Sequence, residues 1–157
     1  MRRTKSNGGQ RAGEFAPQDS AGYLVRDAHR AFQHLLEQRI APYGVTRGQW
    51  YFLRVLWTRD GVSQRELSES VGMMEPTTVI ALRSLEKAGL IRRVRSSEDK
   101  RVANVWLTAK AKRIREQMLL LARGINEDAS QGLSREDFDT FRRIITRMTE
   151  NLDRVMR

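Results

Sequence analysis

Cysteine is absent from the 157-residue sequence. This absence excludes disulfide bonds, thiolate catalysis, cysteine-ligated zinc and any regulatory switch that works by thiol oxidation. No apolar run approaches the roughly 20 residues that are needed to cross a bilayer. The basic residues within positions 1–19 are not followed by the apolar stretch of a secretory signal. We therefore expect a cytoplasmic protein with no membrane partner.

The usual signatures of catalysis are also missing from the sequence. Its two histidines, His29 and His34, are five positions apart, so they do not form the i, i+4 pair that binds zinc on one helix face. Neither a glycine-rich phosphate loop nor a Gly-x-Ser-x-Gly motif occurs. We expect no enzymatic activity, no metal site and no cofactor.

Charge is the most unusual property that is present. The sequence has 29 Lys and Arg residues against 19 Asp and Glu residues, a net charge of +10. An excess of this size in a chain of one domain's length indicates a polyanionic partner, with nucleic acid ahead of an anionic membrane. Residues 1–19, rich in Gly, Arg, Gln and Ser, are predicted to be a flexible basic tail, and residues 20–157 a single domain.

Six helices are predicted from the spacing of apolar residues and from capping residues at the helix ends. Their approximate ranges are 20–41, 46–59, 63–71, 75–88, 108–127 and 134–155. Thr46 and Thr108 are predicted N-caps, and Ser63 with Glu66 has the spacing of a capping box. Pro76 suits the first turn of a helix, and Gly89 suits a C-terminal cap.

A β-hairpin is predicted between the fourth and fifth helices. Its strands are Ile91–Arg95 and Val102–Leu107, joined by a polar turn. Basic side chains outnumber acidic ones in this hairpin. The basic residues are Arg92, Arg93, Arg95, Lys100 and Arg101, and the acidic ones are Glu98 and Asp99. Arginine at the tip of a hairpin can enter the narrow minor groove of DNA.

The fourth helix has two different faces. Thr78, Ala81, Leu82 and Leu85 fall on the side that is predicted to be buried. The other side and its flanks carry Pro76, Thr77, Ile80, Arg83, Ser84 and Lys87. The major groove of B-DNA admits one helix, whose outer residues reach base edges. Polar residues of this face can hydrogen-bond to bases, and Ile80 can pack on thymine methyl groups. The alternative interpretation is an ordinary amphipathic surface helix.

Residues 62–108 resemble the MarR family of bacterial regulators (multiple antibiotic resistance regulators). The matching stretches are SQRELSESVG, EPTTVIALRSLEKAGLIRR and the wing pattern SSEDKRVANVWLT. TRGQWYFLRVLW and the flanking helices extend the resemblance to nearly all of residues 20–157. The implied fold is mainly α with a small β-hairpin wing (α+β). It comprises a winged helix-turn-helix over 45–108 between dimerisation helices over 20–44 and 109–157.

The resemblance implies a set of DNA-binding residues. They are Ser63, Gln64, Pro76, Thr77, Ile80, Arg83, Ser84, Arg95, Asp99, Lys100 and Arg101. Arg101 is expected at the minor groove, oriented by Asp99 through a charge-assisted hydrogen bond. Ile80 departs from the family, many of whose members have a basic residue there, so we expect a different base preference at this position.

The sixth helix repeats apolar residues at coiled-coil spacing. Its predicted dimerisation residues are Phe138, Phe141, Ile145, Met148 and Leu152. The resemblance likewise implies a homodimer, whereas the alternative is that this face packs within its own chain. The expected function is a repressor that binds a pseudo-palindromic operator in double-stranded DNA. Alternatives are a sequence-independent DNA-architectural protein and a module that binds an acidic protein.

Many members of the family release DNA when a small aromatic or anionic molecule binds. The residues that suit such an effector are Arg26, His29, Trp50 and Arg54. They offer cations, a titratable imidazole and an aromatic wall. Trp50 is alternatively a core residue, and His29 a structural one.

Overall fold

The computed structural model describes residues 16–96 and 101–156, and this part of the chain is mainly α-helical. Its α-helices are α1 (Ala21–Ile40), α2 (Arg47–Leu56), α3 (Gln64–Val71), α4 (Glu75–Lys87), α5 (Ala109–Ala129) and α6 (Arg135–Val155). Its strands are β1 (Val62–Ser63), β2 (Ile91–Arg95) and β3 (Ala103–Leu107). Two 3₁₀ helices are η1 (Pro17–Asp19) and η2 (Ala41–Tyr43). The mainly α fold with a small β wing confirms the predicted fold class.

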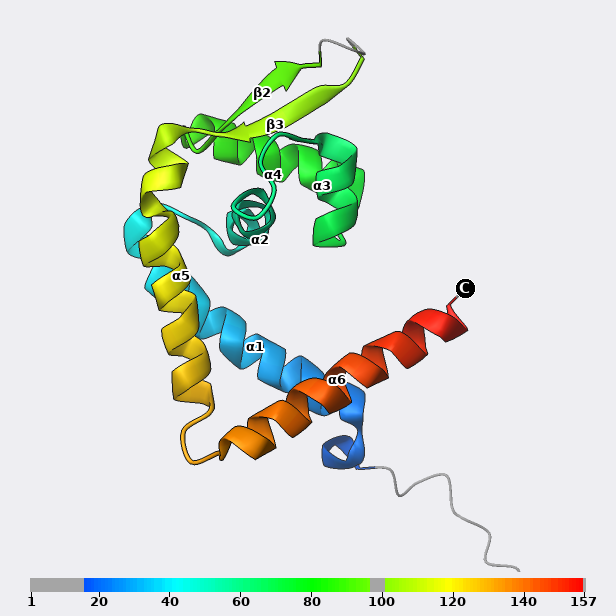
Figure 1. The fold of residues 1–157 in the computed structure, drawn as a ribbon. Coiled ribbons are helices and arrows are strands. Elements are labelled where there is room, and N and C mark those ends of the chain that lie inside the picture. The colour runs from blue at the N-terminus through cyan, green and yellow to red at the C-terminus, as the bar shows by residue number, and fades with distance from the viewer. Residues whose placement is uncertain (1–15, 97–100, 157) are drawn as a thin grey trace, which may run out of the picture.

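The elements form two regions that α5 connects. Figure 1 shows α2, α3, α4 and the sheet at one end, while α1 and α6 lie toward the other. α1 contacts α5, and α5 starts soon after β3. No described helix combines the length and the apolarity that a bilayer crossing requires.

Local capping interactions fix where the helices begin. The predicted capping box of Ser63 and Glu66 is present, and Ser134 forms a further capping box with Asp137 at the start of α6. Thr46 also forms a capping box, with Gln49, where the sequence predicted only the Thr46 cap. Hydrogen bonds from the backbone N–H and the hydroxyl of Ser63 lower the pKa of Glu66. Each box satisfies backbone donors that a helix N-terminus leaves unpaired.

The core lies between α2, α3, α4 and the sheet. Phe52, Leu53, Leu67 and Val105 are inaccessible to solvent there. The predicted inner face of α4 is confirmed, because Thr78, Leu82 and Leu85 are fully buried and Ala81 is half-buried. Burying one such leucine or phenylalanine side chain stabilises the fold by about 1.5–3 kcal/mol. α4 is therefore held by one face and leaves the other uncovered.

A third strand joins the predicted hairpin. β2 pairs with β3 from Ile91 opposite Leu107 to Arg95 opposite Ala103, and β1 pairs with the other edge of β3. The sequence did not predict β1, because two residues are too short for a recognisable strand pattern. Ser63 lies in this strand and caps α3 as well.

Other differences from the prediction concern the ends of elements. Pro17–Asp19 form a 3₁₀ helix within the stretch that was predicted to be a flexible tail, and Ser20 caps α1. The wing strand β3 begins at Ala103 and not at Val102, and α5 continues to Ala129. Helix and strand ends depend on a few hydrogen bonds and are the least predictable part of an element.

The turn before β1 anchors the root of the wing. The Asp60 carboxylate accepts hydrogen bonds from the backbone N–H groups of Gly61 (3.1 Å) and Leu107 (2.8 Å). Its second oxygen lies 3.1 Å from Nζ of Lys112. Gly61 has a φ of +76°, and a Cβ there would lie 2.4 Å from the ring of Trp106. Both the conformation and the ring require glycine at this position.

We expect Gly61→Ala to destabilise the protein more than Gly72→Ala. Gly72 has a similar φ of +69°, but a Cβ there would meet nothing within 4 Å, so this substitution bears only the cost of the left-handed conformation, about 1–2 kcal/mol. At Gly61 the displacement of Trp106 adds about 1–3 kcal/mol. Urea unfolding at one protein concentration measures both variants. Equal losses would show that Trp106 does not crowd this turn.

Candidate nucleic-acid interface

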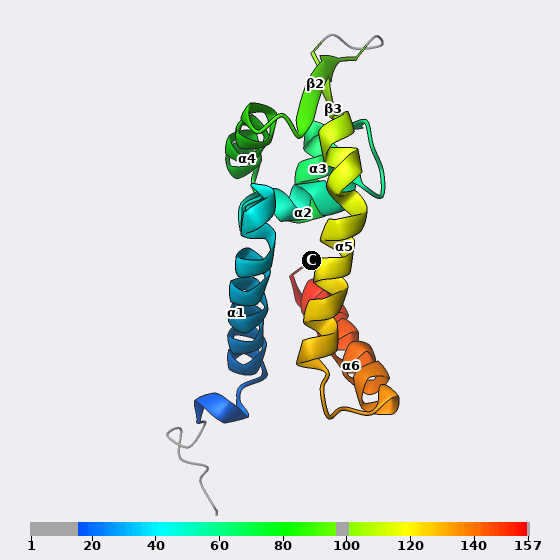
Figure 2. The same ribbon diagram turned by 90° about the vertical axis from the view of Figure 1, so that its left-hand side faces the viewer.

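The outer face of α4 is an uncovered helical surface beside the wing. Figure 2 shows α4 at the periphery, and its predicted outer residues Pro76, Thr77, Arg83 and Ser84 are exposed. The side chain of Ile80, on the same face, is 69% exposed. Lys87, which the sequence places on this side, is exposed near the C-terminal end of the helix. The structure thus brings these predicted residues together on one surface.

Ser84 has a partner that the sequence did not indicate. Nε2 of the buried Gln49 donates a hydrogen bond of 2.8 Å to the Ser84 hydroxyl oxygen. Oε1 of Gln49 accepts from the backbone N–H of Thr46 in the capping box. Ser84 retains its O–H as a donor toward a ligand, while one of the two lone pairs of its oxygen accepts from Gln49. Gln49 therefore links α2 to α4. The one sequence signal for a role of Gln49 was its place three residues after the N-cap Thr46.

The N-terminus of α3 lies beside the wing. A hollow of about 350 Å³ separates them, and its lining consists of Ser63, Gln64, Arg65, Glu75, Arg101, Val102 and Ala103. Predicted residues from two distant parts of the sequence, Gln64 and Arg101, therefore meet at one surface. Arg65 was not predicted to belong to this surface, and its Nε pairs with Glu69 at 3.0 Å.

Of the remaining predicted residues, Arg95 ends β2 and Arg101 precedes β3 by two positions. Arg95 and Arg101 are exposed, whereas Asp99 and Lys100 lie outside the described residues. Arg93 has a different role from its neighbours, because its Nη2 lies 2.7 Å from a carboxylate oxygen of Glu86 on α4. The hydrogen bond from Arg93 lowers the pKa of Glu86. This ion pair joins the wing to α4.

Two of the four predicted effector residues line one cavity. The cavity, of about 150 Å³, lies between α1, α2 and α5, and its lining is His29, Phe32, Gln33, Leu36, Trp50, Tyr51, Ala122, Ile125 and Asn126. Nε2 of Gln33 donates to the Tyr51 hydroxyl at 3.1 Å and lies 2.5 Å from Nε2 of His29. The lining combines an apolar wall with a short polar chain.

The two predicted arginines lie outside this cavity. The Arg26 guanidinium lies over the ring of Tyr23, 4.6 Å from its centroid. Arg54 lies over the ring of Trp50 at 5.7 Å but lines a separate surface hollow with Arg59. Trp50 itself is buried, so it serves both as a core residue and as a cavity wall. Helical spacing alone could not show which of the four predicted effector residues line the cavity and which lie outside it.

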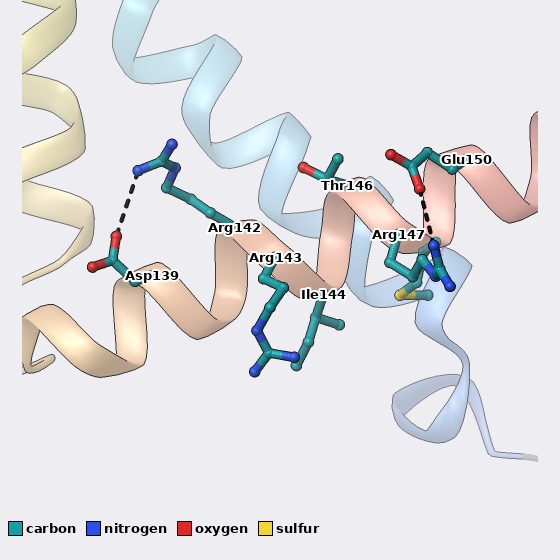
Figure 3. A pocket seen from close by; sticks show the side chains of 8 residues that line it. Asp139, Arg142, Arg143, Ile144, Thr146, Arg147 and Glu150 are labelled. Atoms are coloured by element: carbon teal, nitrogen blue, oxygen red, sulfur yellow. Dashed lines mark hydrogen bonds and ion pairs between the residues drawn. The ribbon is translucent and has the colours of Figure 1, made fainter.

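The surface of α6 is open along its whole length. None of its residues is buried, and Phe141 and Leu152 are 55% and 63% exposed. A hollow of about 770 Å³ follows α6, and Figure 3 shows that all of its labelled residues come from this one helix. The ion pairs Asp139–Arg142 and Arg147–Glu150 also lie within α6. No second element closes this hollow in the described part of the chain.

The described residues contain no group of three or more His, Cys, Asp or Glu side chains that could hold a metal ion.

The arrangement of α3, α4 and the β2–β3 wing is that of a winged helix-turn-helix protein. The profile of the MarR family matches residues 45–103. The chain belongs to the MarR family of transcriptional regulators.

Solved structures extend this likeness to most of the chain. A MarR transcriptional regulator from Methanosarcina mazei Go1 is 28% identical, with 85% of this chain and 90% of that chain covered and a TM-score of 0.78. A further crystallised transcriptional regulator is 30% identical, with coverage of 85% and 98% and a TM-score of 0.74. The transcriptional repressor CouR, solved bound to a 23-mer DNA duplex, is 26% identical, with coverage of 84% and 94% and a TM-score of 0.77.

Proposed function

We propose that this protein is a sequence-specific repressor that binds an inverted-repeat operator as a homodimer. The observation that carries the proposal is the common surface of α3, α4 and the wing. The outer face of α4 is exposed, and Gln64 at the start of α3 borders the same hollow as Arg101. A helix that is exposed along one face and flanked by cations fits the major groove. The DNA-bound repressor CouR has the same fold and supports this interpretation.

The proposed contacts divide by chemistry. Thr77, Ile80, Arg83 and Ser84 face base edges, where the O–H of Ser84 is available as a donor while its oxygen accepts from Gln49. A second group contacts phosphates or the minor groove. It consists of Ser63, Gln64, Arg95, Lys100 and Arg101, with Asp99 in the role of orienting Arg101, while Pro76 offers only apolar contact at the start of α4. Phosphate contacts give affinity and register, while base contacts give specificity.

The alternative function is sequence-independent binding as a DNA-architectural protein, which the net charge of +10 alone would support. Selection of bound duplexes from a random library, followed by footprinting, separates the two. A regulator protects one discrete inverted repeat whose half-sites are about 10 base pairs apart. Comparable affinity for every duplex would instead establish the architectural function.

We expect Arg101→Ala to weaken binding to the selected operator by roughly 1–3 kcal/mol, because it removes the proposed minor-groove contact. Fluorescence anisotropy with a labelled operator measures the change at fixed salt concentration. Arg30→Ala is the control, since it removes an exposed cation from α1, far from the wing. Affinity that is equal in the two variants would remove Arg101 from the interface.

The proposed dimer rests on apolar side chains that the chain leaves uncovered. Large hydrophobic residues on α1, α5 and α6 are exposed. They include Tyr23, Leu24, Val25, Phe32, Leu120, Phe141, Ile144 and Leu152. Phe138, Ile145 and Met148 are half-buried on α6. Exposed apolar surface of this kind is typical of a protein–protein contact, and a twofold dimer is the commonest closed assembly.

We expect Phe141→Asp to convert the dimer to a monomer, because a carboxylate buried in the α6 contact would have no partner. Sedimentation velocity measures the mass, and circular dichroism checks that the helices remain. Thr146→Asp places the same charge at an exposed polar position of α6 and should leave the dimer intact. A dimer that persists in Phe141→Asp would assign the interface to other helices.

The proposed effector site is the cavity that contains His29 and Trp50. Because Arg26 and Arg54 do not line it, its chemistry suits a small aromatic molecule with a hydrogen-bonding group more than an anion. α5 forms one wall of this cavity and is also tied to α2, since Nε1 of Trp57 donates to the Ala111 carbonyl at 3.1 Å. A ligand that moves α5 would therefore reach the wing through β3.

Phenol and benzoate are suitable probes of this site. We expect phenol to weaken operator binding by a factor within about 5–150, the usual range of allosteric coupling. His29→Ala should raise the phenol concentration that is required for release of the operator, because His29 lines the cavity. Arg26→Ala should leave that concentration unchanged, because Arg26 does not line it. Anisotropy of the protein–operator complex during titration measures both. Release by benzoate alone, unchanged in His29→Ala, would place the effector site elsewhere.

A further inference from the structure

Ile80 occupies the centre of the outer face of α4. Residues advance by about 100° around a helix, so the buried residues Thr78, Leu82 and Leu85 point in one common direction. Ile80 points to nearly the opposite side, and its side chain is 69% exposed. If α4 enters the major groove, as the proposed function requires, Ile80 is the residue that lies deepest in it.

The outer face of α4 is divided along its length. Pro76 and Ile80, with the uncharged Thr77, give the N-terminal half a surface without charge, whereas Arg83 and Lys87 make the C-terminal half cationic. Lys87, at the C-terminal end of the helix, is placed to meet a phosphate, while Arg83 lies between it and Ile80 in the sequence. The uncharged half is left to meet base edges, and this arrangement is complementary to a groove whose walls are anionic and whose floor carries methyl groups.

Two hydroxyl groups of α4 already have partners within the protein. The Thr78 hydroxyl is buried and donates to Ser68 Oγ at 3.1 Å. The Ser84 oxygen accepts from Gln49. Thr77 and Arg83 can still read neighbouring bases through hydrogen bonds. Ile80 has no polar group in its side chain, so it can distinguish bases only by contact with apolar atoms.

The apolar group on the floor of the major groove is the 5-methyl group of thymine. Cytosine presents a polar amino group at the same edge, and an isoleucine packed against it would leave that donor unpaired. We propose that Ile80 recognises the 5-methyl group of a pyrimidine in each half-site, so that thymine or 5-methylcytosine is bound in preference to uracil or cytosine. This proposal deepens the proposed function and rests on it.

The test uses synthetic duplexes of the selected operator in which deoxyuridine replaces thymine one position at a time. Deoxyuridine keeps every hydrogen-bonding group and removes only the methyl group. Burial of one such carbon contributes about 0.8 kcal/mol, so we expect affinity to fall about fourfold at the contacted position and to change little elsewhere. At that position, 5-methylcytosine should bind about fourfold more tightly than cytosine.

Variants assign the methyl effect to Ile80. In Ile80→Ala the ratio of affinities for the thymine and deoxyuridine duplexes should fall to about one. In Lys87→Ala that ratio should persist while binding to both duplexes weakens, because Lys87 is proposed to contact a phosphate and not a base. Circular dichroism checks that each variant is folded.

Each outcome decides a different point. A discrete operator that binds equally well with thymine or deoxyuridine at every position overturns methyl recognition and leaves the proposed function standing. A methyl effect of the same size in Ile80→Ala would assign it to DNA shape, which also overturns the role of Ile80. Binding without any preferred sequence would overturn both the proposed function and this inference.

Discussion

The burial of one face of α4 is the constraint on which the rest of the structure depends. Thr78, Leu82 and Leu85 are fully enclosed by α2, α3 and β2, so rotation of α4 about its axis would expose leucine and bury charge. Either change would cost several kcal/mol. The outer face is therefore oriented by the core, and its residues need no ligand to be held in position.

Two polar contacts set the parts of the interface relative to α4. The Gln49–Ser84 hydrogen bond fixes α4 against the start of α2, and the Arg93–Glu86 ion pair fixes it against the wing. They engage Ser84, which the sequence predicted to contact DNA, and Arg93, one of the cations of the hairpin. The Ser84 oxygen and the Arg93 guanidinium are therefore engaged within the protein, and α4 and the wing are held in a fixed relative position.

α5 connects this interface to the opposite end of the molecule. Its first turn is tied to α2 through Trp57 and to the wing root through Lys112 and Asp60. Its C-terminal part borders the cavity between α1 and α2 and pairs with α1 through Arg39 and Asp128. A single helix that contacts both regions is a direct physical route by which an effector or a dimer contact can alter the wing.

Interactions between residues close in the sequence were predictable, and those between distant residues were not. The capping boxes, the C-terminal glycines and the two faces of α4 depend on neighbours within about four positions, so the sequence alone determined them. The pairing of β1 with β3, the partner of Ser84 and the exclusion of Arg26 and Arg54 from the cavity join segments far apart along the chain. Only the tertiary structure decided these features, because chain packing selects among many residues that have the same helical spacing and the same chemistry.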